Sequence, residues 1–209
     1  MYKKKNYEKE EMNMVELKRH SGIAFAILVI ISGIFIIFSY NNLITLDENT
    51  AAKWSDVEVQ YQRRADLIPN LVNVVKGYAS HEKETLEELT KLRAKTFQLS
   101  QNNIPSADQL KQFDDAQVAM TAALTRLIAV AENYPDLKAN QNFLELQAQL
   151  EGTENRIAVA RKDFNDAVKA FNTSIRRFPN NCLSSLLGFE SKAYLQSQSG
   201  AAEAPQIAF

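Results

Sequence analysis

Few residues in this chain have the chemistry of a catalytic or metal-binding centre. The 209 residues include two histidines, His20 and His81, and one cysteine, Cys182. A structural zinc site takes about four Cys or His ligands, and an intrachain disulfide takes two cysteines. A di-iron centre in a helical bundle needs Glu-x-x-His pairs, but Leu17 and Tyr78 occupy the positions three before the histidines. We therefore expect no disulfide, no metal and no other cofactor.

His81 is the histidine that a hydrolase could use, together with the neighbouring carboxylate of Glu82. It lies in the charged stretch KGYASHEKE, where no pattern marks a pocket. Nucleophilic catalysis needs a base positioned against a nucleophile, and the sequence offers no such pairing. Glycine-rich phosphate-binding loops are missing as well, because the glycines are isolated. We predict that the protein is not an enzyme and keep His81 and Glu82 as interaction candidates.

The charge balance argues against a nucleic acid partner. The chain has 24 Lys and Arg against 25 Asp and Glu, which gives a net charge of −1. A protein that binds DNA or RNA usually presents a strongly basic face to the phosphates. We therefore expect no nucleic acid partner.

An uncharged apolar run, SGIAFAILVIISGIFIIFSY, covers residues 21–40. As a helix this run would be about 30 Å long, which matches the hydrocarbon core of a bilayer. A cleaved signal peptide is the alternative, but the run is longer than a typical signal-peptide core, and no small-x-small cleavage pattern follows it before Asn41. The sequence predicts an uncleaved transmembrane helix.

Basic residues lie mainly before this run. Residues 1–20 contain Lys3, Lys4, Lys5, Lys9, Lys18 and Arg19. The next twenty or so residues after the run contain Lys53 alone. The flank that is richer in Lys and Arg stays in the cytoplasm. We expect residues 1–20 to be a cytoplasmic tail and the chain beyond residue 40 to lie outside the cytoplasm.

From residue 41 onward, apolar residues recur at spacings of three and four, which indicates helices and no strands. The first helix should begin near residues 47–50 and, after a pause at 81–85, continue to about residue 99. Ser106 should cap the second helix and Pro135 should end it. A third helix should run from about Ala139 to Arg177. A short last helix would contain Leu183, Leu186, Leu187 and Phe189.

These helices predict an all-α fold, an elongated antiparallel bundle on a single membrane helix. The spacing approximates the heptads of a coiled coil, which indicates shallow helix crossings. We expect the bundle to cover residues 41–195 and residues 196–209 to be a flexible tail. Ile68 and Phe164 should lie on buried seams, whereas Arg93 should be exposed and its replacement nearly silent.

Pro69 interrupts a strong amphipathic pattern in QYQRRADLIPNLVNVVKGY. It cannot bond to the carbonyl of Ala65, so we expect a bend here, with Asp66 as a possible cap of a restarted helix. One interpretation of Arg63, Arg64 and Asp66 is a local cluster of salt bridges and caps. The other is a recognition patch that the bend exposes.

The first helix, at about fifty residues, would be longer than the second can cover. Trp54, Val57 and Tyr61 near the membrane would then remain uncovered and could join copies of the chain. Ile207 and Phe209 in the tail could act as intermolecular hooks, although fraying of the tail is the alternative. The third helix could instead cover the apolar surface within one chain.

Several separated motifs resemble the LemA family of bacterial proteins. They are WSDVEVQYQRRADLIPNLVNVVKGYASHEKETLEELTKLRAK, LTRLIAVAENYPDLKANQNFLELQAQLEGTENRIAVARKDFNDAVKAFNTSIRRFP, GFE and EAPQIAF. The resemblance implies one N-terminal membrane helix, a helical bundle and an association with the cell envelope, in one branch with magnetosome membranes. It implies no catalytic residues. The signature stretch is Gln62, Arg63, Arg64, Asp66, Leu67, Ile68, Pro69, Asn70 and Leu71, with His81 and Glu82. The N-terminal extension MYKKKNYEKEEMNMVELKRH is longer than is usual in the family.

Three functions fit the sequence to different degrees. The first is a non-enzymatic scaffold in the bacterial inner membrane, with a periplasmic or extracytoplasmic bundle. Its partners would be the lipid bilayer, other copies of the chain and unidentified envelope proteins. The second is a ligand-sensing or signalling adaptor, which would need a separate output partner. The third is the hydrolase that would use His81 and Glu82.

Overall fold

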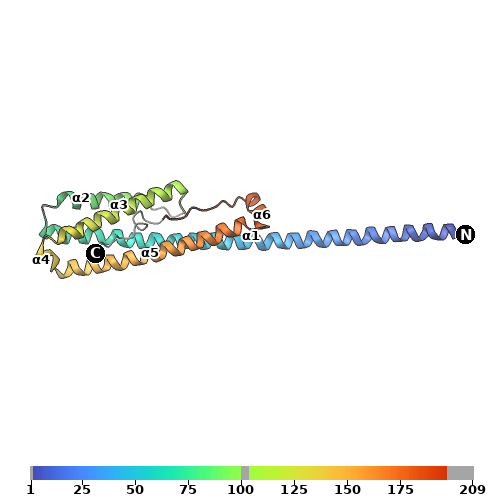
Figure 1. Ribbon diagram of the computed structural model, residues 1–209, viewed down its shortest axis with the longest axis horizontal. Helices are drawn as coiled ribbons and strands as arrows, with labels where there is room; N and C mark the ends of the chain where they lie inside the picture. The colour runs from blue at the N-terminus through green and yellow to red at the C-terminus, as the bar shows by residue number, and fades with distance from the viewer. Residues whose placement is uncertain (1, 100–103, 197–209) are drawn as a thin grey trace, which may run out of the picture.

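The computed structural model describes residues 2–99 and 104–196. Six helices follow one another in this part of the chain: α1 (Tyr2–Tyr78), α2 (Lys83–Leu99), α3 (Ala107–Ala131), α4 (Pro135–Lys138), α5 (Gln141–Arg176) and α6 (Asn180–Leu187). The described residues include no strand, so the all-α prediction is confirmed. Figure 1 shows an elongated bundle from which the N-terminal half of α1 projects as a single helix.

Helix α1 runs without interruption from the apolar run into the bundle. Its 77 residues make a rod of about 115 Å. The prediction of a separate helix beginning at residues 47–50 is therefore wrong. Thr50, which looked like a cap, is fully buried, and its hydroxyl donates to the carbonyl of Leu46 at 2.8 Å. A hydroxyl bonded back to the previous turn sits inside a helix and does not start a new one.

The first amphipathic segment is two helices and not one. α1 ends at Tyr78, and α2 begins at Lys83 after a turn in which the Glu82 amide donates to the Ala79 carbonyl at 3.1 Å. The pause in the apolar pattern at residues 81–85 marks this turn. In Figure 1, α2 returns alongside α1, and α3 runs antiparallel to α2. The expected mismatch between a long first helix and a short second one therefore disappears.

The later helix boundaries agree with the sequence. Ser106 caps α3 in a capping box, in which its hydroxyl accepts from the Gln109 amide at 3.4 Å and the Gln109 side chain accepts from the Ser106 amide at 2.9 Å. α3 ends at Ala131, and Pro135 opens the short helix α4. α5 occupies most of the range expected for the third helix.

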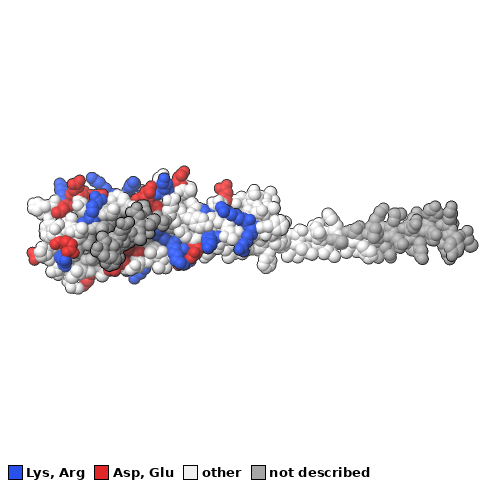
Figure 2. Space-filling model, in the orientation of Figure 1, with Lys and Arg blue, Asp and Glu red and all other residues white. Residues whose placement is uncertain are grey.

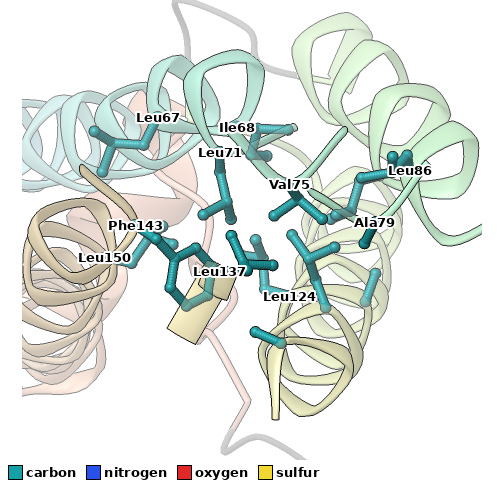
Figure 3. Close-up of a cluster of buried hydrophobic side chains, with 14 of the residues drawn as sticks. Leu67, Ile68, Leu71, Val75, Ala79, Leu86, Leu124, Leu137, Phe143 and Leu150 are labelled. Atoms are coloured by element: carbon teal, nitrogen blue, oxygen red, sulfur yellow. The ribbon is translucent and has the colours of Figure 1, made fainter. Parts of the chain in front are cut away.

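The core extends along the whole bundle in three clusters. The cluster farthest from the apolar run joins five helices, as Figure 3 shows for Leu67, Ile68, Leu71, Val75, Ala79, Leu86, Leu124, Leu137, Phe143 and Leu150. The middle cluster surrounds Trp54, and the third surrounds Leu43. Ile68 and Phe164 are buried as predicted, at 1% and 0% exposure.

The last helix differs from its prediction. α6 ends at Leu187, and Gly188 after it has a φ of 78° and supplies the left-handed cap that glycine tolerates. The expected apolar stripe of this helix is only partly packed within the chain, because Leu186 is 82% exposed whereas Phe189, just after the cap, packs against the cluster around Leu43. The predicted tail hooks, Ile207 and Phe209, lie outside the described residues.

Candidate functional site

The three apolar residues expected to join copies of the chain are buried within one chain. Trp54, Val57 and Tyr61 are exposed by 1%, 1% and 4%. The Trp54 ring makes edge contacts with the rings of Phe113 on α3 and Phe164 on α5, both at 5.4 Å. The prediction of an uncovered surface here is wrong, because α3 and α5 cover this part of α1.

Arg64 in the signature stretch is a buried cation. It is 1% exposed, and its Nη1 donates to Glu154 Oε1 at 2.7 Å and to Thr121 Oγ1 at 3.0 Å. Its Nη2 donates to Oε1 of Gln117, which is itself buried. These partners come from α3 and α5, so the local cluster with Arg63 and Asp66 is wrong for Arg64. A signal for this centre that the sequence does contain is Gln117, a polar residue on the apolar seam of α3.

The helix continues through Pro69 because α2 supplies the missing hydrogen bond. The carbonyl of Ala65, four residues earlier, accepts from Arg93 Nε at 2.9 Å. Asp66 does not cap a new helix, since α1 is unbroken, and its carboxylate accepts from Gln62 Nε2 at 2.8 Å. Arg93 is thus half-buried and bonded to α1, whereas the sequence predicted an exposed residue.

The exposed part of the signature is a polar strip on α1. Arg63, Asp66, Pro69 and Asn70 are all exposed. These four residues remain available to a partner, in contrast to Arg64. The signature stretch thus has an inner face that holds the bundle together and an outer face that is open to solvent.

A second, partly buried polar cluster joins three helices to the segment after α6. Arg161 Nη1 donates to Asp114 Oδ1 at 2.6 Å and to the Tyr61 hydroxyl at 2.8 Å. Its Nη2 donates to the carbonyl of Gln196 at 2.5 Å. Burial raises the pKa of Tyr61, and the charge of Arg161 opposes this rise. The sequence did not single out Arg161 or Asp114, because both look like ordinary charged residues on long helices.

Two asparagines of α5 hold the extended segment 189–196 against the bundle. The Asn172 side chain both donates to the carbonyl and accepts from the amide of Lys192, at 2.8 and 2.9 Å. Asn165 makes the same pair of bonds with Leu195, both at 2.9 Å. Asn165 and Asn172 are seven residues apart on a helix, and Lys192 and Leu195 are three residues apart in an extended segment. Both spacings are about 10 Å, so each asparagine lies opposite its backbone partner.

His81 and Glu82 lie in the turn between α1 and α2. His81 is exposed, and Glu82 is half-buried and accepts from the Tyr134 hydroxyl at 3.2 Å. This bond ties the turn to the start of α4. Within the ranges 2–99 and 104–196, no group of three His, Cys, Asp or Glu residues could hold a metal ion.

The end of the bundle nearest the apolar run is closed by α6. Ser39 Oγ donates to Asn180 Oδ1 at 2.6 Å, and the rings of Tyr40 and Phe189 lie 6.1 Å apart. Leu43, one turn further along α1, is fully buried. In the described part of the chain, one helix is long and apolar enough to cross a membrane, and it is α1.

Comparison with known proteins matches residues 53–209 to the LemA family. The magnetosome protein MamQ 2 of Paramagnetospirillum magneticum is 29% identical over 198 residues, which cover 86% of this chain and 73% of that protein. The magnetosome protein MamQ of Magnetospirillum gryphiswaldense is 27% identical over 195 residues, covering 84% and 72%. The protein LemA of Metamycoplasma hominis is 25% identical over 176 residues, covering 84% and 77%. The chain therefore belongs to the LemA family.

Proposed function

We propose that the protein is a non-enzymatic scaffold, anchored in the bacterial inner membrane, that presents a helical bundle to other envelope components. The observation that carries this proposal is the continuity of α1, which is one helix from Tyr2 to Tyr78. A helix that enters the membrane at one end and the bundle core at the other would hold the bundle at a set distance from the bilayer.

The exposure pattern along α1 supports the anchor. Phe25 and Phe38 are 70% and 78% exposed, whereas Leu43 is fully buried a few residues later. A long, contiguous apolar surface of this kind is costly in water and favourable in a bilayer. The change from exposed to buried apolar residues supports a membrane surface near residue 40.

The use of the polar side chains supports a role without catalysis. Arg64, Arg161 and Gln117 are all committed to hydrogen bonds that join helices. His81 is exposed, and Glu82 bonds to Tyr134. The matched relatives also have names that describe no enzyme, among them the magnetosome proteins.

The proposal includes the orientation of the chain in the membrane and the partners of the bundle. The basic residues before the apolar run favour a cytoplasmic N-terminus and a bundle outside the cytoplasm. Partners would be the bilayer, other copies of the chain and envelope proteins, and confinement to a membrane raises the effective concentration of each copy. Contacts between copies would use exposed residues such as Arg63 and Asn70, because Trp54 is buried.

A signalling adaptor is the second candidate, and the same helix favours it. Because α1 is unbroken, a shift of its bundle end would move its N-terminal end as well. Such an adaptor would need a separate output protein on the cytoplasmic side. Capture of a cytoplasmic partner that requires residues 1–20 would favour the adaptor over the scaffold.

Two measurements on cells test the anchor and its topology. Alkaline carbonate extraction should leave the full chain in the membrane fraction and release a variant that lacks residues 21–40. An alkaline phosphatase reporter fused after Phe209 should be active, since it acts outside the cytoplasm. Complete extraction of the full chain would overturn the anchor, and an inactive but stable fusion would overturn the topology.

A further inference from the structure

α6 lies where the apolar segment of α1 ends. Asn180, its first residue, accepts from Ser39 on α1, and Phe189, just after its end, contacts the ring of Tyr40. If residues 21–40 fill the hydrocarbon core, Ser39 and Tyr40 lie within about 3 Å of its edge. Figure 1 shows α6 beside α1 at the end of the bundle from which α1 projects. α6 is therefore placed at the level of the bilayer surface.

The residues around α6 have the chemistry of an interfacial membrane contact. Phe178 is 84% exposed and Leu186 is 82% exposed, among the highest values for large apolar residues in the bundle. Arg176 and Arg177 precede them and are exposed. Residues 173–189 contain these two arginines and no acidic residue. Figure 2 shows basic side chains gathered on the bundle near the point where it narrows to the projecting helix.

We propose that residues 176–187 form a second membrane contact that binds anionic lipid. Phe178 and Leu186 enter the interfacial region of the bilayer, as exposed apolar side chains of surface helices do. Arg176 and Arg177 bind lipid phosphates, for which the planar guanidinium provides paired donors. The proposal rests on the proposed anchoring, because α1 is what brings α6 to the bilayer.

This contact would fix the orientation of the bundle. A single helix leaves a protein free to tilt about its point of entry into the membrane. A second contact beside α1, joined to it through Ser39 and Tyr40, removes part of that freedom. The bundle would then stand at a defined angle to the bilayer when anionic lipid is present.

Cys182 makes a direct test possible. It is the one cysteine of the chain, it is exposed, and it lies on α6. Full-length protein carrying a spin label at Cys182 is placed in nanodiscs of phosphatidylcholine with or without phosphatidylglycerol. The spin label collides with dissolved oxygen, which enters lipid, and with a nickel chelate, which stays in water. The ratio of these two collision rates reports how deep the label lies in the bilayer. We expect this ratio to be several-fold higher with phosphatidylglycerol than for a water-exposed label.

Two reference labels calibrate the measurement, both in a Cys182→Ser background. Asp136→Cys places a label on α4 at the far end of the bundle and should report water. Ile30→Cys places a label in the apolar run and should report lipid. A water-like ratio at Cys182 with a lipid-like ratio at Ile30→Cys would overturn the second contact while leaving the anchor intact. A water-like ratio at both sites would overturn the anchor and the contact together.

Paired variants separate the two parts of the contact. Arg176→Gln with Arg177→Gln should lower the ratio at Cys182 in phosphatidylglycerol to its value in phosphatidylcholine. Lys138→Gln with Lys162→Gln removes the same charge from exposed sites elsewhere and should change nothing. Phe178→Ser with Leu186→Ser should give a water-like ratio in both lipids. Equal ratios in the two lipids for the unsubstituted chain would overturn the binding of anionic lipid.

Discussion

Arg93 on α2 donates a hydrogen bond from Nε to the carbonyl oxygen of Ala65 on α1, at 2.9 Å. Pro69, four residues after Ala65, has no backbone N–H and leaves this carbonyl without its helical partner. Arg93 therefore completes the hydrogen bonding of α1 from a neighbouring helix. The proline and the arginine act as a pair, although 24 positions separate them in the sequence.

The first prediction tests this pair. Arg93→Ala should lower the free energy of unfolding by about 1–2 kcal/mol, because the Ala65 carbonyl loses its donor in a partly buried position. In a Pro69→Ala background the backbone N–H of residue 69 can donate to the Ala65 carbonyl, so Arg93→Ala should lower the free energy of unfolding by less. Thermal unfolding of the full chain in detergent, followed by circular dichroism, measures both costs.

Arg126→Ala is the matched control, since Arg126 on α3 also bonds to α2, through Glu88 at 2.8 Å, but is 59% exposed. Exposed ion pairs contribute about 0–1 kcal/mol. An equal loss for Arg93→Ala with and without Pro69 would show that the Ala65 carbonyl does not depend on Arg93.

The second prediction concerns the buried cation. Arg64→Ala should destabilise the bundle by about 3 kcal/mol or more, because it leaves the Gln117 amide and the Glu154 carboxylate without their donor. Arg63→Ala, at the neighbouring exposed position, should change stability by less than about 0.5 kcal/mol. Similar melting temperatures for these two variants would contradict the assignment of Arg64 to the interior.

The third prediction concerns pH. Burial raises the pKa of Tyr61 above its ordinary value of 10.0, so the folded state holds the phenol proton more tightly than the unfolded state. The contribution of this group to stability is complete below pH 10 and is lost as the pH rises through the folded-state pKa. The free energy of unfolding, measured from pH 8 upward, should therefore decline above pH 10, and this decline should be shallower in Tyr61→Phe. An identical slope in the two proteins would show that Tyr61 does not titrate this way.

The fourth prediction tests the two asparagines of α5. Asn165→Ala should raise the hydrogen exchange rate of the Leu195 amide, and Asn172→Ala that of the Lys192 amide, because each side chain accepts from that N–H. Asn155→Ala, an exposed position on the same helix, is the control. Unchanged exchange at Leu195 in Asn165→Ala would mean that segment 189–196 is held by other contacts.

Much of the fold follows from local signals in the sequence. Ser106 is followed by Gln109 and an apolar stripe, which marks the start of α3, and Pro135 marks the boundary between α3 and the short helix α4. The burial of Ile68 and Phe164 followed from the spacing of the apolar residues alone. These signals act within a few residues of each other, so one sequence is enough to read them.

The polar interior could not be read in this way. Arg64 bonds to Glu154 and Gln117, which are 90 and 53 positions away. Helical spacing says which face of a helix is apolar, but it does not say which charged residue on one helix meets which on another. The turn at residues 79–82 was missed because the pause in the apolar pattern beside it is equally compatible with a charged stretch inside one long helix. Trp54 was misplaced as a consequence, since the missed turn changed the expected lengths of the helices.

The proposed function depends on the continuity of α1 between the apolar run and the bundle, and a distance measurement tests this continuity. Spin labels at Ile30→Cys and Gln62→Cys, in full-length Cys182→Ser protein in nanodiscs, lie 32 residues apart on exposed positions of α1. Pulsed electron paramagnetic resonance should give one narrow distance distribution centred at about 48 Å, the length of an unbroken helix of 32 residues. A broad distribution, or one centred well below this distance, would show that α1 breaks between the membrane and the bundle.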